Sequence, residues 1–302
     1  MPRTRKDRVM KPAPFQYLRP ATVAEALEQL ASYPDAKVMA GGQSLMALMN
    51  LRLARPGVIV DIGRLDELRR IFDDTEDLIL GALVTHRTVE TDPLIAARAP
   101  LLADAARYIG HVGIRNRGTI GGSVAHADPA AEMPLSTLVL DATFHVESAT
   151  RGRRQVRAED MFVSYFTSAL EPDELITWVS IPAARYGQGW GFVEYAHQHG
   201  DYGLAGAGAV LGLDADGRIC ELRCAVLSAA DRPLLFVGDD AVGERPSARL
   251  WETLASRWAR STDPSSDDPD YSRQLCETAL FEALTEATRR VGERQERVDA
   301  YR

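Results

Sequence analysis

The sequence is poor in cysteine. Of its 302 residues only Cys220, Cys224 and Cys276 are cysteines, and no two of them form a CxxC pair. An odd number without that spacing argues against a disulfide framework and against an iron–sulfur cluster or zinc site held by this chain alone. We therefore expect no metal site in the chain and a reducing, cytoplasmic location.

Long apolar runs and an excess of basic residues are also missing. No run of about 18 apolar residues occurs, and the N-terminus lacks the apolar segment of a secretory signal, so no transmembrane helix and no export signal are predicted. The formal net charge of −8 does not fit a nucleic-acid-binding surface. A short basic run lies at the N-terminus, where residues 1–10 are predicted to form a flexible tail.

What is present is sufficient for two domains of ordinary size, since 45% of the residues are hydrophobic. Strands and helices alternate without a regular βαβ rhythm, which predicts an α+β fold. The character of the chain changes after Pro182, and we place a domain boundary between about Ala183 and Gly191. The predicted domains are 11–184 and 190–302.

Hydrophobic periodicity and capping residues predict the individual elements. Asp128-Pro129 is predicted to begin a helix, with the aspartate as N-cap and the proline at the first helical position. The stretch 110–123 holds five glycines and is predicted to be a loop. The predicted helices begin at Thr22 and span 45–53, 100–109, 128–140, 247–260 and 271–291; the predicted strands are 37–40, 58–62, 68–72, 78–83, 143–147, 155–158, 175–181, 192–196, 204–213 and 219–227.

Two glycine-rich segments are the main chemical signal. Ala40-Gly-Gly-Gln-Ser44 stands between a predicted strand and a helix, and Gly118-Thr-Ile-Gly-Gly-Ser123 precedes Asp128. Glycine lets backbone N–H groups approach a pyrophosphate without a Cβ in the way, and successive N–H groups form an anion site. Each segment alone is a weak signal, and neither is a GxGxxG fingerprint or a P-loop. A pair about 80 residues apart could meet around one dinucleotide.

Other candidates have ordinary structural explanations. Gly206-Ala-Gly208 lies in a predicted strand, where close packing explains it better than nucleotide binding. Asp128 is explained by its predicted capping role, and Glu132 by the preference for acidic residues in a first helical turn. Tyr202 and Tyr165 are of a type more often found in a core or an interface than against a cofactor. No catalytic acid–base pair or triad is evident.

Together, AGGQSLMALMNLRLARPGVIVDIGRL (residues 40–65) and IRNRGTIGGSVAHADPAAEMP (residues 114–134) make the chain recognisable. The pair resembles the FAD-binding medium subunit of the molybdenum hydroxylases, the family of xanthine dehydrogenase and carbon monoxide dehydrogenase. HGDYGLAGAGAVL (residues 199–211) and the C-terminal segment 267–287 extend the resemblance over nearly the whole chain. It is weakest at 234–263, which looks divergent.

The resemblance implies a two-subdomain FAD-binding domain of the vanillyl-alcohol-oxidase type in 11–184, followed by a smaller α+β domain with an antiparallel sheet and helices. Ser123 stands where relatives often have Asn, Glu132 where they have Asp, and Glu194 where some have Lys. Leu175 and Ile176 match a position near the flavin, and Tyr202 an aromatic at the isoalloxazine edge. Carried over by position, the implied FAD contacts are Val38, Met39, Ala40, Gly41, Gly42, Gln43, Ser44, Gly118, Thr119, Ile120, Gly121, Gly122, Ser123, Asp128, Glu132, Leu175, Ile176 and Tyr202.

The same resemblance implies a role in electron transfer within a heterotrimer, or a dimer of heterotrimers. A large partner subunit would carry the molybdopterin cofactor and a small one the [2Fe–2S] clusters. This chain would take electrons from the clusters and pass them to an external acceptor through FAD. Two alternatives stay open: a self-sufficient FAD-dependent oxidase of the same fold, and an FAD-free subunit kept for assembly.

Overall fold

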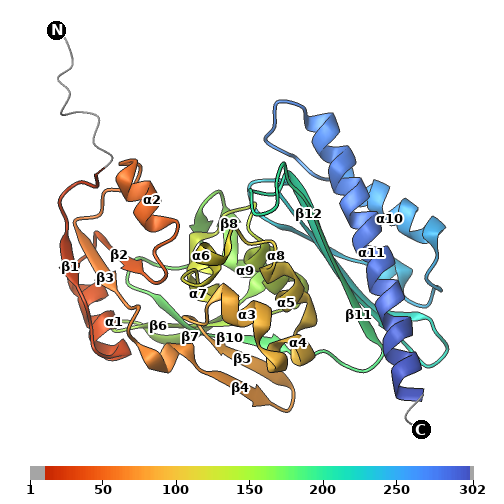
Figure 1. Ribbon diagram of the computed structural model, residues 1–302, viewed down its shortest axis with the longest axis horizontal. Coiled ribbons are helices and arrows are strands. Elements are labelled where there is room, and N and C mark those ends of the chain that lie inside the picture. Colours follow the sequence, from red (N-terminus) through yellow and green to blue (C-terminus); the bar gives the residue numbers. More distant parts are fainter. Residues whose placement is uncertain (1–10, 300–302) are drawn as a thin grey trace.

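Three main sheets are arranged along the long axis of the computed structural model, which describes residues 11–299 and their side chains to residue 292 (Figure 1). The tail predicted for residues 1–10 lies outside the described residues. None of the described helices is long and apolar enough to cross a membrane. The mixture of helices and mainly antiparallel sheets confirms the predicted α+β class.

The N-terminal lobe is built on a small parallel sheet with the order β1-β3-β2. The predicted helix cap at Thr22 is confirmed, because its hydroxyl accepts a hydrogen bond from the Glu25 N–H at 3.1 Å. The helix that follows buries Ala26, Leu27 and Leu30 in the core of this lobe. The elements are β1 (Gln16–Leu18), α1 (Val23–Ser32), β2 (Ala36–Met39), α2 (Leu45–Asn50), β3 (Val58–Asp61) and the 3-10 turn Asp66–Arg69.

The central sheet is antiparallel, with the order β4-β5-β10-β6-β7. Short helices pack on it and form the largest hydrophobic core of the chain. The predicted strands 68–72 and 78–83 pair as a hairpin, although the first begins only at Ile71 because Asp66–Arg69 is helical. The elements are β4 (Ile71–Asp74), β5 (Asp77–Gly81), α3 (His86–Thr91), α4 (Pro93–Arg98), α5 (Pro100–Ala106), β6 (Thr143–Ser148), β7 (Gly152–Arg157), α9 (Ala158–Met161), β8 (Phe162–Ser164), β9 (Thr167–Ser168) and β10 (Leu175–Pro182).

The prediction of a loop at 110–123 is wrong, because the segment contains α6 (Val112–Arg115) and the start of α7 (Ile120–His126). Thr119 caps α7 by accepting a hydrogen bond from the Gly122 N–H at 3.2 Å. Ile120 and Val124 lie one turn apart on α7, and both side chains are buried. The abundance of glycine obscured this helical spacing.

The predicted start of the next helix at Asp128 is also wrong. The Asp128 Oδ1 accepts a hydrogen bond from the Ala130 N–H at 2.9 Å, which closes a local turn before the helix. The helix itself is α8 (Glu132–Val139), and the residue at its N-cap is Ala131. The 45–53 helix likewise ends early, at Asn50, and the 271–291 helix extends to Asp299.

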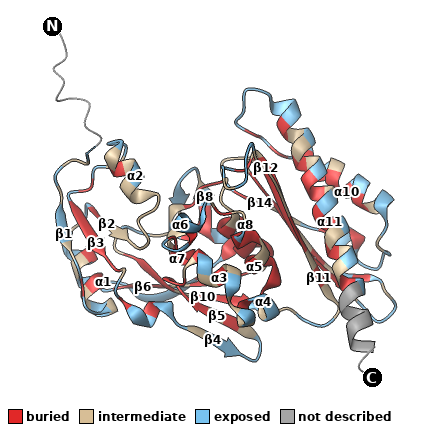
Figure 2. Ribbon diagram, in the orientation of Figure 1, coloured by how far each residue is buried: buried red, intermediate tan, exposed pale blue. Residues whose placement is uncertain are grey.

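The third sheet, β11-β12-β13-β14, is antiparallel, and two helices cover its outer face (Figure 1). Its inner face packs on α5 and α8 of the central unit, so that β12 is buried almost throughout (Figure 2). The stretch 234–263, divergent in sequence, supplies the edge strand and one helix. The elements are β11 (Gln188–Tyr195), β12 (Ala205–Leu213), β13 (Ile219–Leu227), β14 (Leu234–Val237), the 3-10 turn Asp239–Ala241, α10 (Ala248–Ala259) and α11 (Pro269–Asp299).

Glycines set the spacing of this third unit. A Cβ on Gly191 would lie 2.1 Å from the Ala283 carbonyl oxygen, so only glycine lets α11 approach β11 this closely. A Cβ on Gly208 would lie 2.7 Å from the Leu135 side chain of α8. This confirms the prediction that the glycines of 206–208 serve close packing.

A charged cluster fastens the third unit to the central one. The Asp104 carboxylate of α5 accepts hydrogen bonds from the Trp190 indole at 2.9 Å and from the Arg290 guanidinium at 2.6 Å. The Arg290 guanidinium also lies 4.8 Å from the centre of the Trp190 ring. Two strands away in the same row of the sheet, Arg223 donates to the carbonyl oxygens of Val139 and Leu138, which end α8. These contacts hold the two parts in one arrangement.

Candidate FAD-binding site

The two glycine segments, about 80 residues apart in the sequence, lie in direct contact. A Cβ on Gly41 would lie 2.1 Å from the Arg117 carbonyl oxygen and 2.9 Å from the Gly118 Cα. A Cβ on Gly122 would lie 3.6 Å from the Ala40 Cβ. The prediction that the segments meet is therefore confirmed, and glycine is required where their backbones cross.

The first segment follows β2 and presents free backbone donors. Within the described part of the chain, the N–H groups of Gly41, Gly42, Gln43 and Ser44 donate no hydrogen bond. Gly42 has φ +71, a left-handed conformation that L side chains rarely adopt. The segment is half-buried, and the Ser44 hydroxyl caps no helix. Successive unpaired N–H groups in such a turn make a concave site for an anion, such as a diphosphate.

The second segment contributes differently from the prediction. Its N–H groups are largely used inside the protein, because Ile120 donates to the Val84 carbonyl, Gly121 to the Ala82 carbonyl and Gly122 to the Thr119 hydroxyl. A Cβ on Gly121 would lie 2.6 Å from the Ala82 Cβ, so this glycine allows α7 to pack against the end of β5. The backbone of the second segment is thus held by internal hydrogen bonds, and it forms the wall of the site that the first segment contacts.

His86 lies beneath this wall and was not identified from the sequence. Its backbone N–H donates to the Gly118 carbonyl at 2.9 Å, and its ring edge packs on the Gly118 Cα. Burial, reinforced by the nearby charge of Arg115, lowers the pKa of His86 to about 4, so the imidazole is neutral at pH 7. Its Nδ1 is buried without a hydrogen-bond partner among the described residues. Only its place after a predicted strand distinguished it in the sequence.

Leu175 and Ile176 begin β10 and join two hydrophobic cores. Leu175 belongs to the core of the N-terminal lobe, against which Val38 and Ala40 pack. Ile176 belongs to the central core, together with Ile120 of the second glycine segment. Alternate side chains of a strand point to opposite faces, so two adjacent residues contact both halves of the predicted site.

Acidic residues gather on the side of the site next to the third sheet. Burial and the Asp128 charge raise the pKa of Glu132 to about 7. Burial and the Glu132 charge raise the pKa of Glu194 to about 8. The pKa of Tyr202 is raised by burial of its hydroxyl and by the charges of Asp128 and Glu132. The Tyr202 side chain is nevertheless 71% exposed, so it is not a core aromatic.

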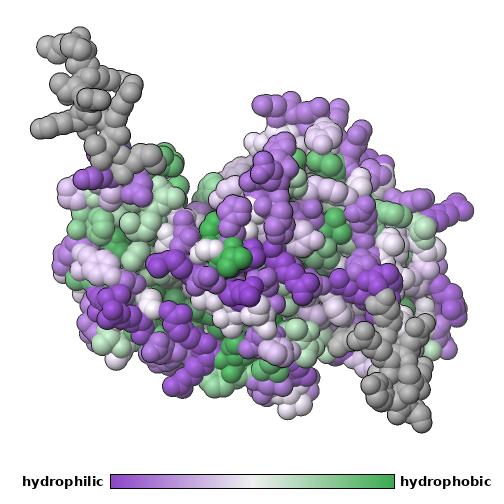
Figure 3. All heavy atoms as spheres, viewed as in Figure 1, coloured by the Kyte–Doolittle hydropathy of each residue, from purple (hydrophilic) through white to green (hydrophobic). Residues whose placement is uncertain are grey.

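The molecular surface dips between the parts of the chain that carry the first glycine segment and Tyr202 (Figure 3). The space-filling view shows the outline dipping between the lobe that carries α2 and the part that carries the β11–β12 connection (Figure 3). In the ribbon view, α6 lies between these two borders (Figure 1). A free N–H row, a glycine crossing that a Cβ would block and an open hollow together fit a bound dinucleotide of the FAD type.

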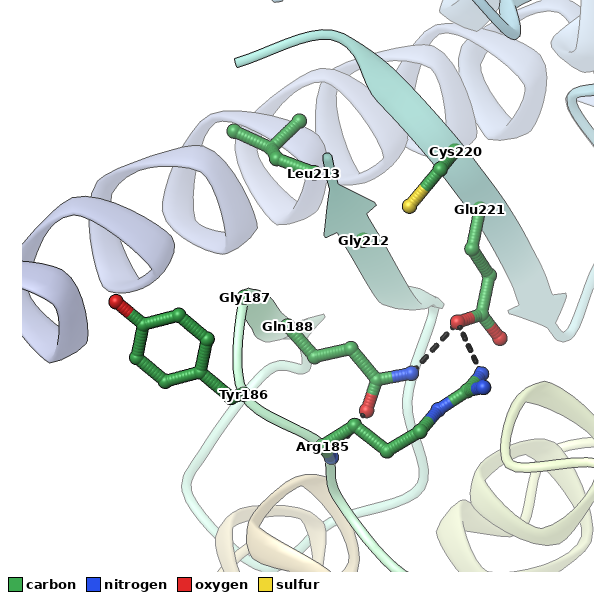
Figure 4. Close-up of a pocket in the computed structure, with 8 residues that line it drawn as sticks. All are labelled: Arg185, Tyr186, Gly187, Gln188, Gly212, Leu213, Cys220 and Glu221. Carbon is green, nitrogen blue, oxygen red and sulfur yellow. Dashed lines mark hydrogen bonds and ion pairs between the residues drawn. The ribbon is translucent and has the colours of Figure 1, made fainter. Parts of the chain in front are cut away.

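Two cavities elsewhere do not coincide with this site. One, of about 340 Å³, is lined by the connection from β10 to β11 and by the paired strands β12 and β13. Within it the Glu221 carboxylate accepts hydrogen bonds from Arg185 at 2.9 Å and Gln188 at 2.6 Å (Figure 4). A wider neighbouring groove, of about 790 Å³, includes part of the same lining. None of the predicted FAD contacts lines either one, and their charged side chains fasten the connection to β13.

Comparison with known proteins places the chain in a family. The sequence profile of the family described as the FAD binding domain in molybdopterin dehydrogenase matches residues 13–184. The nicotine 6-hydroxylase medium subunit of Paenarthrobacter nicotinovorans is 38% identical, over 92% of this chain and 99% of that protein. The carbon monoxide dehydrogenase medium chain of Hydrogenophaga pseudoflava is 32% identical, over 92% of this chain and 98% of that protein.

Solved structures agree with the sequence comparisons. A chain of carbon monoxide dehydrogenase from Hydrogenophaga pseudoflava superposes with a TM-score of 0.88 and 32% identity, over 92% of this chain and 99% of that chain. A chain of quinoline 2-oxidoreductase from Pseudomonas putida 86 gives a TM-score of 0.87 and 34% identity, over 92% of this chain and 98% of that chain. The fold is thus that of an FAD-binding oxidoreductase subunit. More narrowly, the chain belongs to the medium subunits of the molybdenum hydroxylases.

Proposed function

We propose that this chain binds one FAD and relays electrons within a molybdenum hydroxylase complex. It takes electrons from [2Fe–2S] clusters on a small partner subunit and passes them to an external acceptor. The molybdopterin cofactor and the oxidation of the primary substrate belong to a large partner subunit, and the assembly is a heterotrimer or a dimer of heterotrimers. Bound FAD supplies the redox chemistry, while the protein supplies position and electrostatics.

One observation carries the cofactor proposal: the row of unpaired N–H groups from Gly41 to Ser44, seated against Gly118. This row would hold the diphosphate, because it offers several donors and no side chain at the crossing. Ser123, with no side-chain hydrogen bond to another described residue, would add a hydroxyl. Leu175 and Ile176 would pack near the flavin, and Tyr202 at its edge. The proposed FAD contacts are Val38, Met39, Ala40, Gly41, Gly42, Gln43, Ser44, Gly118, Thr119, Ile120, Gly121, Gly122, Ser123, Asp128, Glu132, Leu175, Ile176 and Tyr202.

The proposed domain division is residues 11–184 for the FAD-binding domain and 190–302 for the C-terminal domain. The boundary would fall in the connection between the end of β10 at Pro182 and the start of β11 at Gln188. The medium-subunit relatives match this chain over nearly its whole length, both domains included. That extent supports the subunit over a self-sufficient oxidase, whose second domain would have to hold the substrate.

The primary substrate is proposed to lie outside this chain. Relatives of similar length are named for nicotine, caffeine and carbon monoxide, which share no recognition chemistry. One kind of medium subunit serving such different molecules supports a substrate pocket on another subunit.

The first experiment is an absorbance spectrum of the purified chain, followed by acid release of the chromophore. Flavin bands and about one FAD per chain are expected from a single dinucleotide site. A colourless protein that takes up no added FAD, alone or when produced together with its partners, would contradict the cofactor proposal.

The electron-relay proposal needs the partners. A tagged version of this chain is expected to purify with one large and one small chain, the latter with the absorbance of [2Fe–2S] clusters. In that complex, substrate should bleach the flavin band only when the small chain is present. Bleaching without it would refute the order of electron transfer.

A further inference from the structure

Two half-buried glutamates lie on the two sides of the interface between the central unit and the third sheet. Glu132 is the first residue of α8, and Glu194 lies near the end of β11. The Oε2 atom of Glu194 is buried and has no hydrogen-bond partner among the described residues. The Glu132 carboxyl forms no hydrogen bond or ion pair with another described side chain, and burial is the largest cause of its raised pKa. A buried ionised carboxyl without a donor or a cation is strongly disfavoured.

Neither carboxyl forms an ion pair with a Lys, Arg or His side chain within residues 11–292; the nearest cations, Arg107 and Arg290, lie beyond Tyr108. Glu194 points away from α11, on the same side of β11 as Phe192, and pairs across the sheet with Gly206. The titratable groups around it are Glu132 on α8, Tyr108 after α5, and His199 and Tyr202 in the β11–β12 connection. Asp128 adds a further negative charge near Glu132. Burial, and then the charge of Glu132, raise the pKa of Glu194, and both favour its neutral form.

The pair also lies beside the predicted cofactor. Glu132 and Tyr202 are both among the proposed FAD contacts, and Asp128 and Ser123 precede Glu132 on the same stretch of chain. The carbon atoms of Glu194 lie about 3 Å from the position that a Cβ on Gly203 would take, next to Tyr202. A charge at Glu194 would therefore act on the flavin end of the site at short range and low dielectric.

We propose that Glu132 and Glu194 hold one shared proton beside the flavin, and that this proton couples the redox potential of the cofactor to pH. The inference rests on the proposed function, since it needs FAD in this site. While the proton is held at Glu194 Oε2, the pair carries one negative charge less and electrons are more easily accepted nearby. Loss of that O–H proton to water leaves two carboxylates, which oppose added negative charge.

Water supplies the proton and takes it back, and the partner's clusters supply the electrons. When two electrons arrive from the partner's clusters, an ionised pair takes one proton from water, and an O–H bond forms at Glu194 Oε2. When the electrons leave for the acceptor, that bond breaks and the proton returns to water. The carboxyl groups are neither oxidised nor reduced. One extra proton taken up per two electrons changes the equilibrium constant for reduction tenfold per pH unit. This corresponds to about 30 mV in the midpoint potential per pH unit.

The test compares the midpoint potential of bound FAD in the wild-type chain and in Glu194→Gln, across about pH 6 to 9. Glutamine keeps the shape of the side chain and cannot ionise. Near pH 8, where Glu194 titrates, the wild-type potential is expected to fall more steeply than that of the variant, by up to about 30 mV per pH unit. Glu252→Gln, an exposed carboxyl on α10, is the matched control and should follow the wild type. Equal slopes in wild type and Glu194→Gln would overturn the proposal.

A second measurement works without the cofactor and separates the two proposals. Infrared titration of the FAD-free chain should show a protonated carboxyl band persisting at pH 7, reduced in Glu194→Gln and unchanged in Glu252→Gln. If the band is the same in all three proteins, the pair holds no proton and the inference fails even when FAD binds. If the chain binds no FAD but shows the band, the proposed function fails and the shared proton stands. Glu132→Gln, which removes the partner charge, should shift the titration of the band to lower pH and serves where Glu194→Gln does not fold.

Discussion

Replacing Gly41 with alanine should weaken FAD binding by separating the two glycine segments. The new Cβ would lie 2.1 Å from the Arg117 carbonyl oxygen and 2.9 Å from the Gly118 Cα, whereas ordinary contact begins at 3.4 Å. The obstructing atoms belong to the backbone, so no side chain can rotate away. The segments must therefore move apart by more than an ångström.

The size of the effect follows from the cost of overpacking, about 1–3 kcal/mol. Because 1.4 kcal/mol corresponds to about tenfold in affinity, the dissociation constant of FAD is expected to rise roughly 5- to 140-fold. Part of that strain also acts on the FAD-free protein, where it should appear as a lower midpoint of thermal unfolding.

Fluorescence titration of the FAD-free chain with FAD measures the affinity, and calorimetry measures the stability. Gly113→Ala is the matched control, because it lies on α6 close by and a Cβ there would meet nothing within 4 Å. It should leave both quantities nearly unchanged. If Gly41→Ala bound FAD as tightly as the control, the contact between the segments would have no part in holding the cofactor.

Three further outcomes are expected. Gly191→Ala places a Cβ 2.1 Å from the Ala283 carbonyl and should lower the free energy of unfolding by about 1–3 kcal/mol in urea titration; an unchanged midpoint would mean that α11 is not held against β11 as described. Thr119→Ala removes the α7 cap and should cost about 1 kcal/mol in the same assay, whereas Ser44→Ala, which caps nothing, should cost little; equal losses would contradict this assignment. Because folding raises the pKa of Glu194 from 4.5 to about 8, the folded chain binds more protons between these values, so stability should fall as pH rises from about 4.5 to 8; in Glu194→Gln the fall should be smaller, and an identical pH profile would refute the shift.

Much of the secondary structure was predictable because its signals are local. The Thr22 cap and the strand at 219–227 depend on neighbours a few residues away, and both are confirmed. The failures at 110–123 and at Asp128 have different causes. The Gly121 N–H donates to the carbonyl of Ala82, far away in the chain, whereas Asp128 bonds within a local turn and not at a helix end.

The candidate site divides in the same way. The glycine segments and their family resemblance could be found in the sequence, and so could the expectation that they meet. Which segment has free N–H groups could not, because the donors of Gly121 and Ile120 are taken by carbonyls of the strand-end residues Ala82 and Val84. His86 was missed since its significance comes only from burial beneath Gly118.

By itself the sequence determined the α+β class, the two glycine segments and the family. These properties depend on residue identity and on spacing along the chain. Only the tertiary structure decided that Gly41 lies on Gly118, that the first segment alone keeps its donors free, and that the Glu194 Oε2 atom is buried without a described partner. The physical reason is that hydrogen-bond satisfaction and desolvation depend on which distant residues exclude water from a group, and spacing along the chain does not carry that information.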